Sequence, residues 1–385
     1  GVRSVIFAAP KPDPGRIYIG LNDRDRAWHD LYAVHISTGK LELIRTNDLR
    51  ATHWLFDLDG KLRLAVRTAD NGDTEILRLG PDGSTRIYSC TIVETCWPGP
   101  FHGDGKRVYV TSNHGHDVDL TRLSLIDVES GKEELVATDP QGRVDLERAT
   151  FSARTDALVA TAYTDDDGTR WEWRDSQARA DFELLRSRLP GRELAFSATA
   201  DEQQWLVHAN ADVEPGESYL FDRRNKALTL QYRALEAIPR SALATTTTIR
   251  YSSSDGMRIS GYLTLPKDVE PKRLPLVVMA HGGPWARDRW SYMPQTQFLA
   301  NRGVAVLQPN YRGSTGYGKA FLNAGNREWG ERIQDDLTWG VRYLVEQGIV
   351  DPKRVGIVGS SFGGYCALAG AAFTPDLYAA AASIV

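Results

Sequence analysis

About 235 residues at the start of the chain repeat one short unit, a pair of alternating apolar strands joined by a polar turn. Apolar residues at every second position are typical of a half-buried strand, and Gly or Asn in the turns favours a hairpin. Successive turns lie 44, 48 and 94 residues apart, and 94 is twice 47. Hairpins that recur at intervals in the forties are the signature of β-propeller blades. The copies span 31–44, 74–88, 120–136 and 218–230, with turns at 37–40, 81–84, 129–132 and 223–226.

The double gap of 94 residues is expected to hold one more blade. Strands are predicted at 157–163 and 169–173, and the helical spacing of apolar residues in 178–189 predicts a helical insertion. The count is then about five blade-like units. Ten Trp and fifteen Tyr agree with a β-rich fold, because aromatic side chains fit a pleated surface. A barrel or a sandwich stays open as an alternative, since both also space their strands evenly.

The pattern changes near Pro239, after which strands alternate with helices. Short, wholly apolar strands joined by helices predict a parallel sheet covered on both faces. We therefore place a partial β-propeller in residues 1–238 and a second, α/β domain in residues 239–385. The predicted strands are 244–249, 259–265, 276–280, 304–308, 354–358 and 378–385, and the predicted helices are 295–302, 333–346 and 362–373.

Composition limits the classes of function. Lys and Arg number 46 and Asp and Glu number 50, and the net charge of -4 argues against a nucleic-acid-binding surface as the main function. No run of about 18 apolar residues predicts a membrane helix, and residues 6–10 are too short and poorly flanked for a signal peptide. Both ends look cut, and the compartment, cytoplasm or periplasm, is left undecided.

The cysteines carry little information. Cys90 and Cys96 flank a short apolar stretch, and a C-x5-C spacing without a nearby His pair is a poor zinc signal. We favour two buried free thiols over a disulfide, and we expect no metal site.

One motif carries chemistry. The predicted strand at 354–358 runs into Gly359-Ser360-Ser361-Phe362-Gly363, and a helix is predicted next. This is G-x-S-x-G in the strand–turn–helix setting of a nucleophile elbow, with Ser361 as the nucleophile. The turn requires glycine at Gly359 and Gly363, because side chains there would collide with the neighbouring strand and helix. A phosphate-cradling turn is disfavoured, since the motif lacks the Lys-Ser/Thr ending of a P-loop.

A second motif, His281-Gly282-Gly283-Pro284, follows the buried strand at 276–280. In an elbow-bearing sheet the loop after the third strand gives one backbone N–H to the oxyanion hole, and the residue after the nucleophile gives the other. We assign Gly283 and Phe362 as these donors, with His281 and Gly282 as loop support. His281 as the catalytic base is the alternative, but its place before the nucleophile disagrees with the usual order Ser, Asp or Glu, His.

Four motifs together carry a resemblance: His281–Pro284, Asn310–Gly318, Trp329–Gly330 with Asp335–Asp336, and Gly359–Tyr365. They resemble the prolyl oligopeptidase family of serine peptidases, most of all its acylaminoacyl-peptidase and dipeptidyl-aminopeptidase-like branch. Gly20–Asp30 is also similar to propeller segments of bacterial members, which suggests a bacterial origin. The resemblance covers essentially the whole chain and implies a propeller that caps an α/β-hydrolase domain cleaving short peptides.

Two departures from the family pattern concern the site. Many relatives carry Tyr where Phe362 stands, which leaves a backbone donor unaffected. More severely, the family's triad Asp and His lie after the nucleophile, whereas the 24 residues after Ser361 hold one carboxylate, Asp376, and no His. Asp376 precedes the sixth strand and is too early for the triad acid. Because a serine hydroxyl without a base is a weak nucleophile, we expect the triad Asp and His to be absent and the chain to be an inactive fragment.

The remaining candidate residues are given structural roles or are left open. Asp165–Asp167 is interpreted as a solvated hairpin loop rather than a calcium site. Arg312 is expected to pair with Asp335 or Asp336 and brace the sheet edge rather than to contact substrate. Substrate contact and surface placement are equally open for three residues after the oxyanion loop, Trp285, Arg287 and Arg289.

Two other functions stay open beside the peptidase. A carboxylesterase uses the same elbow, although ordinary esterases lack a preceding propeller. A propeller-based binding protein with a non-catalytic hydrolase domain belongs to a different class. We expect no cofactor; the expected partners are peptide substrates, with no nucleic acid and no membrane, and a homo-oligomer is left open.

Overall fold

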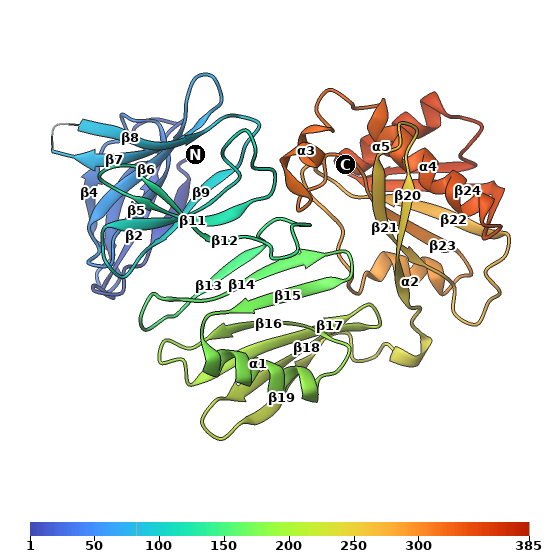
Figure 1. The fold of residues 1–385 in the computed structure, drawn as a ribbon, viewed down its shortest axis with the longest axis horizontal. Helices are drawn as coiled ribbons and strands as arrows, with labels where there is room; N and C mark the ends of the chain where they lie inside the picture. Colours follow the sequence, from blue (N-terminus) through green and yellow to red (C-terminus); the bar gives the residue numbers. More distant parts are fainter. Residues whose placement is uncertain (82, 385) are drawn as a thin grey trace. The chain divides into compact units, whose positions relative to one another are not determined.

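The computed structural model describes residues 1–81 and 83–384, and its contacts divide the chain into two compact units (Figure 1). The first unit comprises 1–142 with 155–158, and the second comprises 143–154 with the residues from 159 onward. The predicted turn at 81–84 and strand at 378–385 each include one residue outside the described part of the chain. The domain boundary at 238/239 stays a prediction. None of the helices in the described residues is long and apolar enough to cross a bilayer.

The first unit holds three four-stranded antiparallel sheets, each built from four consecutive strands (Figure 1). Two of the predicted turns join the third and fourth strands of their sheets, and there Gly39 and Gly131 have φ of 67° and 72°. Glycine takes this left-handed conformation without the cost that a side chain brings, which is why these turns close hairpins. The strands are β1 (Ser4–Ala8), β2 (Arg16–Leu21), β3 (Asp30–His35), β4 (Leu41–Arg45), β5 (Ala51–Phe56), β6 (Leu62–Thr68), β7 (Thr74–Gly80), β8 (Gly83–Cys90), β9 (Cys96–Phe101), β10 (Arg107–Ser112), β11 (Arg122–Asp127) and β12 (Glu133–Ala137).

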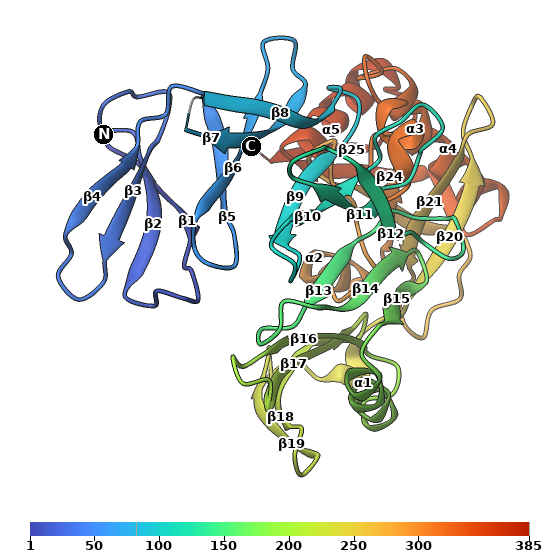
Figure 2. The same ribbon diagram turned by 60° about the vertical axis from the view of Figure 1, so that its left-hand side comes forward.

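The second unit begins with a three-stranded and a four-stranded sheet of the same antiparallel kind. The predicted helical insertion links these two sheets as α1, whose start is capped by the Asp175 carboxylate accepting from the Ala178 amide at 2.7 Å. Helix α1 lies beside the fifth sheet (Figure 2). Its Phe182 and Leu185 side chains pack with Trp205 of that sheet. Five blade-like sheets confirm the predicted propeller class. The elements are β13 (Arg148–Phe151), β14 (Leu158–Asp165), β15 (Gly168–Trp173), α1 (Ser176–Arg188), β16 (Glu193–Ala198), β17 (Gln204–Ala211), β18 (Glu214–Asp222) and β19 (Ala227–Arg233).

The remaining residues form one six-stranded sheet in the order β20-β21-β23-β22-β24-β25. The strands β20, β21 and β23 pair antiparallel, and the pairs from β23 to β25 are parallel. The predicted α/β-hydrolase sheet is thus confirmed, while the short helix α3 was not predicted. The elements are η1 (Arg240–Ala242), β20 (Thr246–Ser252), β21 (Arg258–Thr264), β22 (Leu274–Ala280), α2 (Pro294–Ala300), β23 (Ala305–Asn310), α3 (Gly318–Asn323), α4 (Arg332–Glu346), β24 (Val350–Ser360), α5 (Phe362–Phe373) and β25 (Ala380–Ile384).

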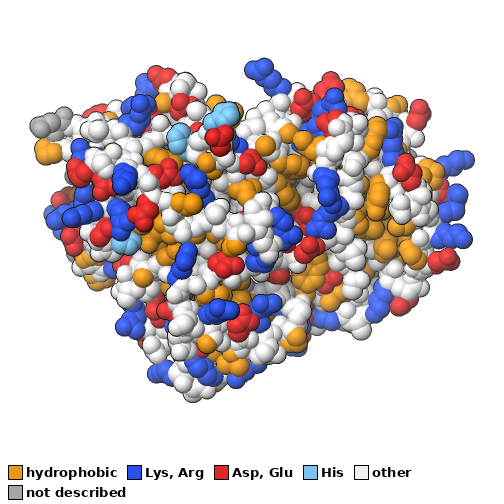
Figure 3. Space-filling model, in the orientation of Figure 1, with side chains coloured by type: hydrophobic (Ala, Val, Ile, Leu, Met, Phe, Trp, Pro, Cys, Tyr) orange, Lys and Arg blue, Asp and Glu red, His pale blue; other side chains and the backbone are white. Residues whose placement is uncertain are grey.

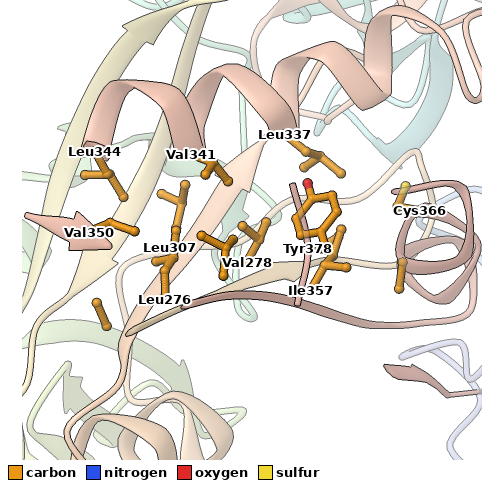
Figure 4. Close-up of a cluster of buried hydrophobic side chains, with 14 of the residues drawn as sticks. Leu276, Val278, Leu307, Leu337, Val341, Leu344, Val350, Ile357, Cys366 and Tyr378 are labelled. Carbon is orange, nitrogen blue, oxygen red and sulfur yellow. The ribbon is translucent and has the colours of Figure 1, made fainter. Parts of the chain in front are cut away.

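Helices cover both faces of this sheet, as its apolar strands predict. Successive side chains of β22 point to opposite faces, so Leu276 and Val278 face one side and Val277 faces the other. Leu276 and Val278 are buried with Leu337 and Val341 of α4 and with residues of α5 (Figure 4). Val277 lies on the side of α2. The buried sheet therefore holds the carboxyl ends of β22 and β24 in fixed positions.

The cysteines correct one expectation. Cys90 and Cys96 are buried, as expected, but they are joined by a disulfide rather than free. The five residues between them form a short loop that brings the ends of β8 and β9 together. Cys366 on α5 is a free and buried thiol.

Charged side chains on the surface are mixed in sign. On the face drawn in Figure 3, Lys and Arg side chains are interspersed with Asp and Glu side chains. Many of them pair, as Arg107 does with Asp104 at 2.7 Å and with Glu134 at 2.8 Å. Exposed pairs of this kind contribute at most about 1 kcal/mol each, so the fold depends on its cores.

Candidate active site

Ser361 stands in a sharp turn between β24 and α5. Its φ of 55° and ψ of -120° lie where residues with a side chain are rarely found, so the turn is strained. The Ser361 amide donates to the Ile384 carbonyl at 2.9 Å, and the Tyr365 amide donates to the Ser361 carbonyl at 3.1 Å. A paired strand and the first helical turn therefore hold the strained residue from both sides. This is the setting that a nucleophile elbow requires, and the role of Ser361 itself stays a prediction.

The two elbow glycines have no room for a side chain. A Cβ on Gly363 would lie well inside 3.0 Å of the carbonyl oxygen of Ala280 on β22. A Cβ on Gly359 would come equally close to the backbone of Gly363. Because real Cβ atoms essentially never approach so closely, β24 and α5 can pack against β22 in this turn only with glycine at both positions.

The loop of residues 281–289, which follows β22, lies beside the elbow. A Cβ on Gly282 would be 3.6 Å from the Cβ of Ser361, so the loop backbone runs directly past this residue. Gly283 has a φ of 125°, and a Cβ there would lie 2.6 Å from the Trp285 amide nitrogen, so only glycine fits. Within the described residues, neither the Gly283 nor the Phe362 amide has a hydrogen-bond partner. Two backbone donors are therefore free near Ser361.

His281 is held within the loop. Its Nδ1 donates to the Gly282 carbonyl at 2.7 Å, its Nε2 contacts Ser314 Oγ at 2.9 Å, and its ring stacks on Tyr311 with centroids 4.2 Å apart. The Tyr311 hydroxyl also donates to the His281 carbonyl at 2.6 Å. Burial lowers the pKa of His281 to about 4, so the ring is neutral at pH 7. This geometry favours the predicted support role over the alternative of a catalytic base.

Residues 290–385, which contain the elbow, match the family model described as prolyl oligopeptidase family. The part of the chain that carries the elbow therefore matches the prolyl oligopeptidase family. This agrees with the five blade-like sheets, the strand order of the α/β sheet and the strained turn at Ser361.

Curated relatives align with almost all of this chain. Dipeptidyl aminopeptidase BIII of Pseudoxanthomonas mexicana is 37% identical over 391 residues, which is 99% of this chain and 56% of the relative. Dipeptidyl peptidase family member 6 of Caenorhabditis elegans is 27% identical and covers 96% of this chain and 54% of its own length. The chain thus spans about half the length of these curated relatives. A puromycin-hydrolyzing peptidase of Mycobacterium tuberculosis has the same fold, with a TM-score of 0.76 at 19% identity over 99% of this chain and 62% of that chain.

An aromatic cluster beside the elbow was not anticipated. The Phe362 side chain is buried, and its ring lies 5.0 Å from that of Trp329 and 5.5 Å from that of Tyr365. Trp329 remains half-exposed. The spacing of Tyr365 on α5 could have placed it near Phe362, but the loop that carries Trp329 gives no periodic signal. These aromatic side chains therefore form an apolar wall next to Ser361.

Arg312 braces the edge of the sheet through ion pairs with two aspartates. Its guanidinium donates to both carboxylate oxygens of Asp336, at 2.9 and 2.7 Å, and to Asp255 at 2.9 and 3.1 Å. Arg312 and Asp336 are buried, and Ser253 Oγ adds a hydrogen bond of 2.6 Å to Asp336. The predicted internal pairing is thus confirmed for Asp336. Asp335 instead accepts from a serine hydroxyl and does not pair with Arg312.

The blade hairpin at 165–167 corrects another expectation. We predicted a solvated loop, but Asp166 is buried against the hydrolase sheet. Its carboxylate accepts from Tyr317 OH at 2.6 Å and from Ser260 Oγ at 3.0 Å. Its backbone carbonyl accepts from Thr248 Oγ1 at 2.9 Å. The sequence missed this because the partners lie more than 80 residues away along the chain.

The three residues whose roles the sequence left open, Trp285, Arg287 and Arg289, have different environments. Trp285 is 60% exposed. Arg289 pairs at 2.7 Å with Glu147, the residue just before β13 of the fourth blade sheet. Arg287 is buried and donates to the Thr164 carbonyl at 3.1 Å. Arg287 and Arg289 therefore tie the loop to blade residues, whereas Trp285 is open to solvent.

A metal site is not supported by the donor set. Among the described residues, only Cys90, Glu94 and His114 bring three potential ligand atoms within 4.8 Å of one another. The Cys90 sulfur is bonded to Cys96 in the disulfide and is not available as a thiolate ligand. The Glu94 carboxylate accepts from the Gly115 amide at 2.9 Å and contacts His114 Nδ1 at 3.1 Å. Cys90 therefore serves the disulfide, and Glu94 and His114 serve local hydrogen bonding.

Asp288 is a buried carboxyl group near the loop. Burial raises its pKa from 3.8 to about 6. Its Oδ2 has no hydrogen-bond partner among the residues described, although its backbone N–H and carbonyl both pair with the Asn310 side chain. The fold therefore accepts the protonated form of Asp288 more readily than the charged form.

Asp288→Asn is expected to stabilise the protein at alkaline pH. Because the folded pKa is raised, the contribution of Asp288 to stability is complete below pH 4 and is lost as the pH rises through about 6. The variant should raise the free energy of unfolding by up to about 3 kcal/mol at pH 8 and by about half of that at pH 5. Urea unfolding at both pH values measures this, with the exposed Asp376→Asn as control. An equal gain at both pH values, or none at pH 8, would contradict the assignment.

Proposed function

We propose that this chain provides the nucleophile and oxyanion hole of a serine peptidase that hydrolyses short peptides. Ser361 attacks the scissile carbonyl and forms an acyl-enzyme. The Gly283 and Phe362 amides donate to the oxyanion, and the N-terminus of α5 adds its dipole to the same charge. The strained turn at Ser361, with the glycine loop directly beside it, is the observation that carries this proposal.

The triad Asp and His of this peptidase lie outside the 385 residues. No His follows Ser361 in the sequence, and His281 is engaged by Gly282 and Ser314. The relatives align with this chain over only about half of their own lengths. We therefore propose that the 385-residue chain alone is inactive, and that the polypeptide encoded by the whole gene supplies the triad Asp and His.

The relatives' names guide the choice of substrate. Two of them are called dipeptidyl aminopeptidase and dipeptidyl peptidase, so we propose peptides with a free N-terminus, from which dipeptides are released. The blade sheets would restrict entry to small or unfolded peptides.

The test compares dipeptide chromogenic amides with free and with blocked N-termini, and a simple aryl ester, on the whole gene product. We expect hydrolysis of the free dipeptide amides and none above background with Ser361→Ala. Turnover of the ester alone would favour a carboxylesterase. The absence of any hydrolysis would favour a binding protein with a non-catalytic hydrolase domain.

A further inference from the structure

The loop that carries Gly283 contains a buried cation. The Arg287 side chain is only 1% exposed, and a guanidinium removed from water requires compensating partners. Its Nη1 donates to the Thr164 carbonyl at 3.1 Å, and its Nη2 donates to Tyr317 OH at 3.2 Å. Its guanidinium carbon also lies over the Tyr317 ring, 4.5 Å from the centroid. The position of Arg287 is therefore set by one blade strand and one residue of the hydrolase domain.

The chain makes room for this arginine at Gly316. A Cβ on Gly316 would lie well inside 3.0 Å of Arg287 Nη1, and the φ of Gly316 is 95°. A side chain at this position would thus displace the guanidinium and strain the backbone. Nearby, the Thr315 amide donates to the Ala286 carbonyl at 3.0 Å. Residues 315–317 therefore contact both the backbone of the loop and its Arg287 side chain.

Asp166 supplies the negative charge for this group of residues. Its Oδ1 accepts from Tyr317 OH at 2.6 Å and lies 3.9 Å from Arg287 Nη2, the one ion pair of Arg287 in the described part of the chain. Ser260 Oγ donates to the same oxygen at 3.0 Å. One carboxylate from a propeller hairpin therefore orients a tyrosine and neutralises a buried arginine of the glycine loop.

We propose that Asp166, acting through Tyr317 and Arg287, is a positioning residue that holds the 281–289 loop in the conformation the oxyanion hole needs. Gly282 and Gly283 have no side chains to pack, so this part of the loop depends on contacts made by neighbouring loop residues such as Arg287. Oxyanion donors act through being fixed before the charge develops, so a loosened loop loses transition-state stabilisation. The catalytic part of this inference rests on the proposed function, whereas the ordering of the loop does not.

Hydrogen exchange of the 385-residue chain tests the ordering of the loop. Asp166→Asn keeps the size of the side chain but removes its charge, and it is expected to speed amide exchange in residues 282–289 by about ten-fold. Exchange in β22 should stay unchanged. Asp167→Asn is the matched control, because this exposed neighbour on the same hairpin contacts Arg250 but not Tyr317 or Arg287. It should leave the loop as in the wild type.

A second variant tests the same proposal in case Asp166→Asn does not fold. Tyr317→Phe keeps the ring over Arg287 and removes the hydroxyl that joins Arg287 to Asp166, so it should also speed exchange in the loop, by a smaller factor. Unchanged exchange in the loop for both variants would overturn the proposal. Faster exchange spread equally over β22 would overturn it as well, because Asp166 would then support the whole domain.

Kinetics of the whole gene product separate positioning from substrate binding. Asp166→Asn should lower kcat about ten-fold and leave KM within about two-fold, since it acts on transition-state stabilisation. A raised KM with unchanged kcat would contradict a positioning role. If the wild-type gene product hydrolyses no peptide, the proposed function fails, and the exchange experiment still decides whether Asp166 orders the loop.

Discussion

Gly363→Ala is expected to lower the free energy of unfolding by at least about 3 kcal/mol. The added methyl group would meet the carbonyl oxygen of Ala280, a backbone atom that cannot rotate away as a flexible side chain could. Either β22 or the first turn of α5 must then shift, and both belong to the buried core of the sheet. Thermal and urea unfolding of the variant measure this loss.

Gly356→Ala is the control for this elbow substitution. Gly356 lies on the same strand, β24, but a Cβ there would find its nearest neighbour at 3.5 Å, which is ordinary van der Waals contact. We expect its stability to stay within about 0.5 kcal/mol of the wild type. Equal stability of Gly363→Ala and Gly356→Ala would show that the elbow is not packed as described.

Arg312→Met is expected to cost about 3–5 kcal/mol at pH 7. The substitution keeps much of the side-chain volume but leaves the Asp336 carboxylate buried without its two guanidinium hydrogen bonds. Burial raises the pKa of Asp336, and this effect becomes stronger once the arginine is absent. The loss of stability should therefore shrink as the pH falls, because the protonated acid no longer carries a buried charge.

Two further variants test whether the cost comes from the uncompensated charge. Arg312→Met combined with Asp336→Leu removes both charges and should recover much of the lost stability. Arg354→Met removes an exposed arginine of β24 and should change stability by less than about 0.5 kcal/mol. A double variant that is less stable than Arg312→Met would contradict the account.

Much of the fold could be predicted because its signals are local. Alternating apolar residues around turns such as 129–132 predict hairpins, and wholly apolar runs such as 276–280 predict buried parallel strands. The elbow could be predicted for the same reason, since the steric requirement at Gly359 and Gly363 lies within five residues of the chain.

What could not be predicted depends on contacts between distant residues. The hairpin at 165–167 has the composition of a solvated turn, and only the folded chain brings Asp166 to Tyr317, 151 residues away. The disulfide was missed because a C-x5-C spacing does not specify whether the strands bring the two sulfurs together. The environment of Phe362 likewise depends on Trp329, which lies in a loop without periodicity.

Labelling with a fluorophosphonate probe tests the central claim most directly, namely that Ser361 is the nucleophile of a site whose base lies outside these 385 residues. The account predicts rapid, stoichiometric labelling of Ser361 in the whole gene product, none in its Ser361→Ala variant, and only slow labelling in the 385-residue chain. Rapid stoichiometric labelling of Ser361 in the 385-residue chain, or labelling that survives Ser361→Ala, would contradict it.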